Sequence, residues 1–224
     1  MLNNTDTLIK FCEKRYIYSN YIAEFYNTIS NIFYLIFGLY WLYFFNKNNI
    51  VGLNSFCYST IFLGIGSMLF HSTSNYYMEI VDEFSMFLLN ILILYKFNNF
   101  YNNNKSKKSL VLLNNLTIFS LNSSFIYYLI NKSFNFFLHF YGVSIVIILL
   151  NLYLHDINNT IKFKILGSLL CGKFFWHLEQ NLCYMFYPIF IFHSLWHFFT
   201  AITCYYIINV MYIIESQKNK NKLN

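Results

Sequence analysis

Residues 64–86, GIGSMLFHSTSNYYMEIVDEFSM, join two apolar segments through a short polar connection. His71 stands just before this connection and Asp82 a few residues after it. A later stretch, FIFHSLWHFF at 190–199, carries two more histidines four residues apart in an equally apolar setting. Titratable side chains at membrane depth are costly and are usually retained for function. These stretches therefore predict membrane helices that bring a functional site together.

The composition is that of a membrane protein. Of 224 residues, 57% are hydrophobic and only 11% are charged, more apolar surface than a soluble domain of this size can bury. The apolar runs are far longer than the roughly ten residues of a membrane strand, which favours helices. The first twenty residues show no apolar core or cleavage site of a removable signal peptide, so we expect the first spanning helix to direct insertion.

Seven stretches are long and apolar enough to span a bilayer, which takes about twenty residues each. The fourth is the weakest, because asparagines interrupt it. The stretches are 22–45, 50–71, 79–97, 109–130, 134–154, 162–183 and 189–214. The sequence thus predicts an all-α, seven-transmembrane helix bundle, with residues 1–224 forming a single domain.

Basic residues predict the orientation of this bundle. With seven spans, four basic residues fall on the side of the N-terminus and ten on the opposite side, with Lys173 inside a helix. Because cytosolic loops are enriched in lysine and arginine, we expect a lumenal N-terminus and a cytosolic C-terminus. The formal net charge of +6 is then mostly a topology signal. No basic face with interleaved aromatic residues indicates a nucleic-acid partner.

The costly polar residues converge on the lumenal side of this topology. They are Glu24, His71, Asp82, Glu179 and His193. Separate helices are not expected to place such residues at one depth by chance, so the convergence favours a shared site.

The histidines have the spacing of metal ligands. His193 and His197 lie one turn apart on one helical face, and His71 can supply a third ligand. Three histidines with a water molecule form the open arrangement of catalytic zinc sites. The alternative is that each histidine only hydrogen-bonds a neighbouring helix. That alternative is preferable for an isolated histidine, whereas the set of three beside Asp82 favours a metal.

Two neighbouring residues are candidates for catalysis. Asp82 is either a fourth ligand or a base acting on a water that the metal makes acidic. Ser67 lies one turn before His71, so its hydroxyl can donate to a developing oxyanion. The alternative for Ser67 is a hydroxyl bonded back to its own helix, which is the commoner role of serine in membrane helices.

The remaining histidines and two of the cysteines have simpler interpretations. His139 and His155 lack a partner at metal-ligand spacing and are interpreted as structural or exposed, and His177 as at most an outer contact of the site. Cys12 and Cys183 both map to the lumenal side, which is oxidising, so we predict that they pair. Two free thiols are the alternative.

Four blocks of the chain resemble the alkaline ceramidases. They are FCEKRYIYSNYIAEFYNTISN at 11–31, the quoted stretch at 64–86, FFWHLEQNLC at 174–183 and FHSLWHFFTAITCYY at 192–206. The wider superfamily includes adiponectin-type receptors and shares seven helices and three zinc histidines. The blocks occur in the family's order and are scattered over most of the chain.

This resemblance implies hydrolysis of the amide bond of ceramide to sphingosine and a fatty acid. It implies that His71, His193 and His197 bind zinc. Asp82 would handle the proton of the water, and Ser67 would polarise the carbonyl group or stabilise its oxyanion. Cys12 and Cys183 fall on the family's paired cysteines, which strengthens the predicted disulfide.

The chain departs from the family at the calcium site. The family binds calcium through acidic and polar groups of the N-terminal segment, of which Glu13 and Glu24 remain here as candidate ligands. Lys10 and Arg15 replace an aspartate and an asparagine of that motif. Calcium binds several oxygen ligands, often carboxylates. We therefore hypothesise that calcium is weakened or lost, with Lys10 or Arg15 pairing Glu13 and Glu24 instead.

The leading interpretation is a zinc-dependent membrane amidase acting on ceramide or a related sphingolipid, in the endoplasmic reticulum or the Golgi. One rival is a receptor-like or scaffold member of the superfamily with a non-catalytic zinc site, although such a site does not need Ser67 and Asp82. The other is a related lipid esterase, because nothing in the sequence separates amide from ester chemistry. The sequence indicates no oligomeric state.

Overall fold

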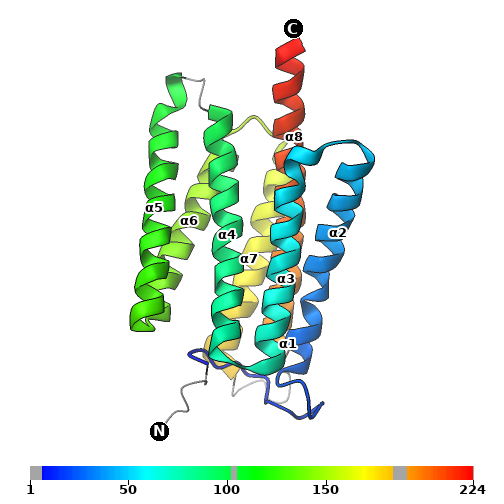
Figure 1. The fold of residues 1–224 in the computed structure, drawn as a ribbon, viewed down its shortest axis with the longest axis vertical. Coiled ribbons are helices and arrows are strands. Elements are labelled where there is room, and N and C mark those ends of the chain that lie inside the picture. The colour runs from blue at the N-terminus through cyan, green and yellow to red at the C-terminus, as the bar shows by residue number, and fades with distance from the viewer. Residues whose placement is uncertain (1–6, 102–104, 184–190, 224) are drawn as a thin grey trace. The chain divides into compact units, whose positions relative to one another are not determined.

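The computed structural model describes residues 7–101, 105–183 and 191–223, in which all regular secondary structure is helical, with an irregular segment at 7–24 and no β-strand among the described residues (Figure 1). Seven long α-helices follow one short one. Their bounds are α1 Phe25–Ser30, α2 Ile32–Lys47, α3 Asn54–Thr73, α4 Tyr76–Tyr101, α5 Lys108–Asn131, α6 Phe134–Leu154, α7 Asn159–Leu182 and α8 Phe192–Leu223. Two single-turn 3-10 helices, η1 (Val51–Leu53) and η2 (Lys105–Lys107), precede α3 and α5. The all-α prediction is confirmed.

Each of the seven expected stretches contains one long helix, but the first expected stretch is interrupted. The structure divides it into α1 and α2 at Asn31, which is fully buried. The Asn31 side chain donates to the carbonyl oxygen of Asn27 at 2.8 Å, and the Ser30 hydroxyl donates to the same carbonyl at 2.9 Å. Short polar side chains that form hydrogen bonds with nearby backbone groups compete with the regular hydrogen bonds of a helix, which explains the interruption. The start of the seventh expected stretch lies outside the described residues.

Among the residues that the structure describes, five spans are long and apolar enough to cross a membrane. They are Phe25–Lys47, Val51–Thr73, Lys108–Asn131, Phe134–Leu154 and Phe192–Lys218. The helices α4 and α7 are about as long as these spans, but their acidic and basic residues make them less apolar. The length and apolar composition of these helices thus indicate a multi-pass membrane protein.

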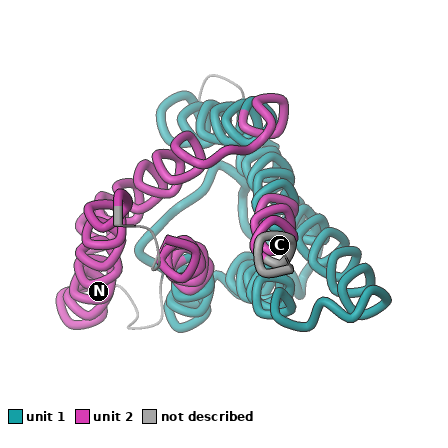
Figure 2. Tube along the Cα trace, turned by 90° about the horizontal axis from the view of Figure 1, so that it is seen from above, with its two compact units in different colours: residues 1–86, 163–208 teal, residues 87–162, 209–224 magenta. Residues whose placement is uncertain are grey.

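The described chain forms two compact units, coloured separately in Figure 2. Unit 1 comprises residues 1–86 and 163–208, and unit 2 comprises residues 87–162 and 209–224. The candidate site residues all belong to unit 1.

Glycines allow the helices of unit 1 to approach closely. A Cβ atom added at Gly64 would lie 3.0 Å from Tyr34 on α2, and one added at Gly66 would lie 3.3 Å from the backbone oxygen of Val81 on α4. Small residues at such interfaces let helix backbones come together in a membrane. Gly66 immediately precedes Ser67, so the close approach of α3 and α4 occurs at the candidate catalytic residues.

A short turn connects α3 to α4. Ser74 adopts the left-handed conformation with φ 46°, and its N–H donates to the carbonyl of Phe70 at 2.7 Å, which ends α3. The side chain of Asn75 then accepts the N–H of Tyr77 at 2.8 Å and so starts α4. This turn folds α4 back along α3, and it brings the end of one helix beside the beginning of the next.

Unit 2 is held together by buried polar side chains between its helices. Asn114 donates to Asn98 at 2.9 Å, and Asn151 donates to Asn114 at 2.8 Å, which links α4, α5 and α6. Asn90 donates to Ser144 at 2.8 Å farther along α4 and α6. Such bonds join helices where the hydrophobic effect cannot, and they account for the asparagines that weaken the fourth expected stretch.

Candidate metal centre

Three histidines from α3 and α8 form a buried cluster. The ring centroid of His71 lies 4.9 Å from that of His193 and 4.9 Å from that of His197. The centroids of His193 and His197 are 4.4 Å apart. All three side chains are buried, and one potential ligand nitrogen of each lies within 4.8 Å of the others. The turn between α3 and α4 fixes His71 near the end of α3, while the four-residue spacing in α8 aligns the other two. This group could hold a metal ion.

Hydrogen bonds fix the tautomers of two of these rings. Nδ1 of His71 lies 2.6 Å from Oε2 of Glu24, and Nδ1 of His197 lies 2.8 Å from the hydroxyl of Ser30. Ser30 gives its only proton to the carbonyl of Asn27, so its oxygen must accept from His197. Both rings thus carry the proton on Nδ1, and the lone pair of Nε2 is left free to bind a metal. Metal-binding histidines have this arrangement, with an outer acceptor that orients the ring.

Asp82 and Ser67 meet beside the cluster. Ser67 on α3 and Asp82 on α4 lie beside each other, across the close approach of the two helices at Gly66. Both side chains are buried, and Asp82 interacts electrostatically with His71. Among the described residues, the group of mutually close ligand atoms contains the three histidines without Asp82. This placement fits a proton carrier next to a metal better than a fourth ligand.

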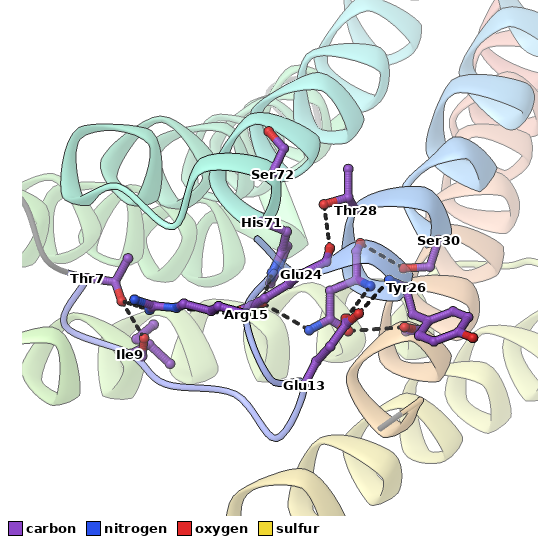
Figure 3. Close-up of polar contacts among 12 residues, drawn as sticks. Thr7, Ile9, Glu13, Arg15, Glu24, Tyr26, Thr28, Ser30, His71 and Ser72 are labelled. Atoms are coloured by element: carbon purple, nitrogen blue, oxygen red, sulfur yellow. Dashed lines mark hydrogen bonds and ion pairs between the residues drawn. The ribbon is translucent and has the colours of Figure 1, made fainter. Parts of the chain in front are cut away.

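Glu13 and Glu24 both belong to the segment that precedes α1 (Figure 3), but they have different partners. Glu13 accepts the backbone N–H groups of Tyr26 and Asn27 at 2.8 and 2.9 Å, one with each carboxylate oxygen. Burial raises the pKa of Glu13 above its ordinary value, which these hydrogen bonds partly oppose. Glu24 instead contacts His71 and Asn27, and its second oxygen lies 3.9 Å from Nε of Arg15.

The N-terminal segment, residues 7–24, is tied across the histidine cluster. Its backbone N–H at Leu8 donates to Glu79 of α4 at 2.8 Å, and that at Cys12 donates to Glu179 of α7. A disulfide joins Cys12 to Cys183, the pair expected from their shared side of the membrane. These contacts hold the segment to two helices that lie far apart in the sequence.

The ring of Phe11 rests on the cluster. Its centroid lies 4.1 Å from that of His193 and 4.9 Å from that of His71. Sequence reasoning did not identify Phe11, Glu79 or Ser30 as parts of this site. An apolar residue beside Cys12 and an acidic residue in the first turn of a helix carry no local signal of such long-range contacts.

The other histidines are not members of this group. His139 is exposed and bonds the backbone of its own helix, and His177 contacts Asn181 on the surface. His155 is buried and packs against Phe100 with ring centroids 4.5 Å apart. These environments are structural or exposed, as their spacing predicts.

Comparison with known proteins places this arrangement in a family. A family model described as Ceramidase matches residues 3–224. The chain belongs to the ceramidase family. Its relatives include alkaline ceramidase YPC1 of Saccharomyces cerevisiae, 36% identical over 85 residues that cover 37% of this chain and 26% of the relative. An alkaline ceramidase of Arabidopsis thaliana is 40% identical over 92 residues, covering 39% and 36%.

A third relative, alkaline ceramidase 1 of Mus musculus, is 37% identical over 83 residues, or 35% of this chain and 30% of the relative. The aligned parts thus span about a quarter to a third of the length of these ceramidases. The resemblance to the family that the sequence blocks indicate is confirmed.

Proposed function

We propose that this chain is an integral-membrane hydrolase that cleaves the amide bond of ceramide, releasing sphingosine and a fatty acid. The observation that carries the proposal is the buried three-histidine group with Ser67 and Asp82 beside it. Family membership, relatives named alkaline ceramidases and five apolar helices support the substrate class.

The donor set fits zinc. Nε2 of His71 is buried and has no hydrogen-bond partner among the described residues, while its Nδ1 is committed to Glu24. Nδ1 of His193 is also buried without a described partner. A buried nitrogen left unpaired is costly unless something binds it. We infer that His71, His193 and His197 hold zinc, which prefers neutral imidazole ligands.

Zinc in such a site supplies Lewis-acid polarisation of a carbonyl group and makes a water molecule acidic enough to deprotonate near neutral pH. Asp82 accepts that proton and returns it to the leaving amine nitrogen, so the amide and one water yield an amine and a carboxylic acid. The Ser67 hydroxyl turns from Asp82 to donate to the carbonyl oxygen as negative charge develops there. A merely structural metal site has no need for this Ser67–Asp82 pair.

We propose that α4 and α7 also span the bilayer, which makes seven spans with a lumenal N-terminus and a cytosolic C-terminus. The charged residues of α4 and α7 support this proposal, because Glu79, Asp82 and Glu179 are buried against protein. The disulfide between Cys12 and Cys183 fits an oxidising lumen. The endoplasmic reticulum or the Golgi is the compartment that we infer.

The position of the N-terminal segment over the cluster supports entry of the substrate from the lipid bilayer. With Phe11 lying on His71 and His193, the lumenal approach to the cluster is covered. Ceramide is a membrane lipid, so we infer that it reaches the histidines between helices.

Purified protein in detergent tests this function. Metal content and the cleavage of a ceramide panel and a glycerolipid ester panel are measured for wild type and for His193→Ala, Asp82→Asn and His139→Ala. We expect about one zinc per chain and ceramide cleavage, both lost in His193→Ala and both kept in the exposed control His139→Ala. Asp82→Asn keeps zinc without turnover. Absence of zinc from wild type, or cleavage of esters with intact ceramides, refutes the proposal.

A further inference from the structure

A chain of polar contacts runs from the N-terminal segment to the histidine cluster (Figure 3). The Arg15 guanidinium donates to the Thr7 hydroxyl at 2.8 Å, and its Nε lies 3.9 Å from Oε1 of Glu24. The other oxygen of Glu24 lies 2.6 Å from Nδ1 of His71. Glu24 therefore stands between a permanent cation and a candidate metal ligand.

The residues of this region do not fit calcium, which the family resemblance places here. Calcium takes about six to eight oxygen ligands. Both oxygens of Glu13 accept backbone N–H groups, and Oε2 of Glu24 is engaged by His71 and Asn27. The remaining oxygen, Oε1 of Glu24, faces Arg15. A guanidinium at this distance repels a divalent cation.

Burial explains why a cation is needed at this place. The side chains of Glu13 and Glu24 are both almost fully buried, and they are close enough to repel each other electrostatically. Buried carboxylates are costly unless a positive charge or hydrogen bonds compensate them. Arg15 reaches Glu24 from a partly exposed position. Lys10, the other basic replacement, is exposed and forms no ion pair among the described residues.

We propose that Arg15 is the built-in cation that takes the place of calcium in this chain and holds Glu24 against His71. Arg15 is thus a positioning residue. It holds the Glu24 carboxylate aimed at Nδ1 of His71, and this orients the ring so that Nε2 is left for the metal. The proposal rests on the proposed zinc site, and it predicts a zinc site that is indifferent to calcium.

The test uses the full chain in detergent, stripped of metals, with zinc affinity and thermal unfolding as readouts. Zinc is titrated against a chromophoric chelator for wild type, Arg15→Asn, Arg15→Lys and Lys10→Asn, each with and without about 1 mM calcium. Lys10→Asn is the matched control, because it removes the same charge from the same segment. Zinc affinity does not depend on turnover, so the test is separate from ceramide cleavage.

We expect Arg15→Asn to weaken zinc binding by about 10- to 100-fold, as loss of an outer contact of a metal site does. Calcium should recover part of this loss, because the variant leaves two carboxylates and a new amide oxygen without a cation. Arg15→Lys should keep more of the affinity than Arg15→Asn, and Lys10→Asn should match wild type. Wild type should show no calcium effect on zinc affinity or melting temperature.

Unchanged zinc affinity in Arg15→Asn overturns the proposal, as does calcium that tightens zinc binding or raises the melting temperature of wild type. If Arg15→Asn does not fold, the calcium response of wild type and the affinity of Arg15→Lys decide the question. If wild type binds no zinc, the proposed function fails, while calcium binding measured on the same protein still tests the role of Arg15.

Discussion

Replacing Glu24 by glutamine isolates the effect of its charge on the metal centre. Glutamine has nearly the same size and keeps an oxygen that can accept Nδ1–H of His71, now at 2.6 Å. It removes the negative charge that orients the imidazole and pairs with Arg15. The variant therefore preserves packing while weakening one contact.

The expected size of the effect follows from that contact. Hydrogen bonds to charged groups contribute about 1.5–3 kcal/mol and neutral ones about 1 kcal/mol, so the change costs about 0.5–2 kcal/mol. Since about 1.4 kcal/mol corresponds to a tenfold change, zinc affinity should fall about 2- to 30-fold. Ser30→Ala removes the neutral partner of His197, 2.8 Å away, and should cost at most about fivefold.

The assay is zinc titration of the metal-free protein against a competing chelator. Glu215→Gln serves as the control, since it removes a carboxylate paired with Lys96 in unit 2 and should leave zinc affinity unchanged. An affinity for Glu24→Gln within about twofold of wild type, or a smaller loss than that in Ser30→Ala, would refute the reasoning.

Three further predictions concern stability. Gly66→Val should lower the melting temperature and the proposed ceramidase activity, because its Cβ would lie 3.3 Å from the backbone of α4, whereas Gly167→Val, with nothing within 4 Å, should lower them far less. Cys12→Ser and Cys183→Ser should each destabilise the fold by about 2–5 kcal/mol, and a double variant with no greater loss in thermal unfolding will show that they act as one bond. Burial lowers the pKa of His155 below its ordinary 6.5, so the unfolded state takes up the proton first as pH falls. The melting temperature should therefore decrease as the pH is lowered below about 6.5. His155→Phe should make the melting temperature depend less on pH in this range, and an unchanged dependence would contradict the role given to His155.

The helices and the histidine cluster were predictable because their signals are local. Long apolar runs locate the helices, and the spacing of His193 and His197 places two rings on one face. His71 and Asp82 flank a single turn, so their proximity follows from helix reversal. The interruption at Asn31 was not predicted, since it depends on side chains that bond the backbone within an apolar run.

The contacts of the N-terminal segment could not be read from the sequence. Phe11 rests on His193, and the backbone at Leu8 bonds Glu79, across separations that no periodic pattern records. The choice between Lys10 and Arg15 as the partner of Glu24 likewise depends on where the segment crosses α3. Only the folded chain distinguishes the two, and it selects Arg15.

The disulfide between residues 171 positions apart makes the order of synthesis significant. Cys12 is synthesised before all of the described helices, but its partner follows α7, and the last two histidines come later still. The N-terminal segment therefore cannot form its native disulfide until α7 has been synthesised. Closure of the disulfide and completion of the three-histidine group thus come late in biogenesis, and chains truncated before α8 cannot assemble that group.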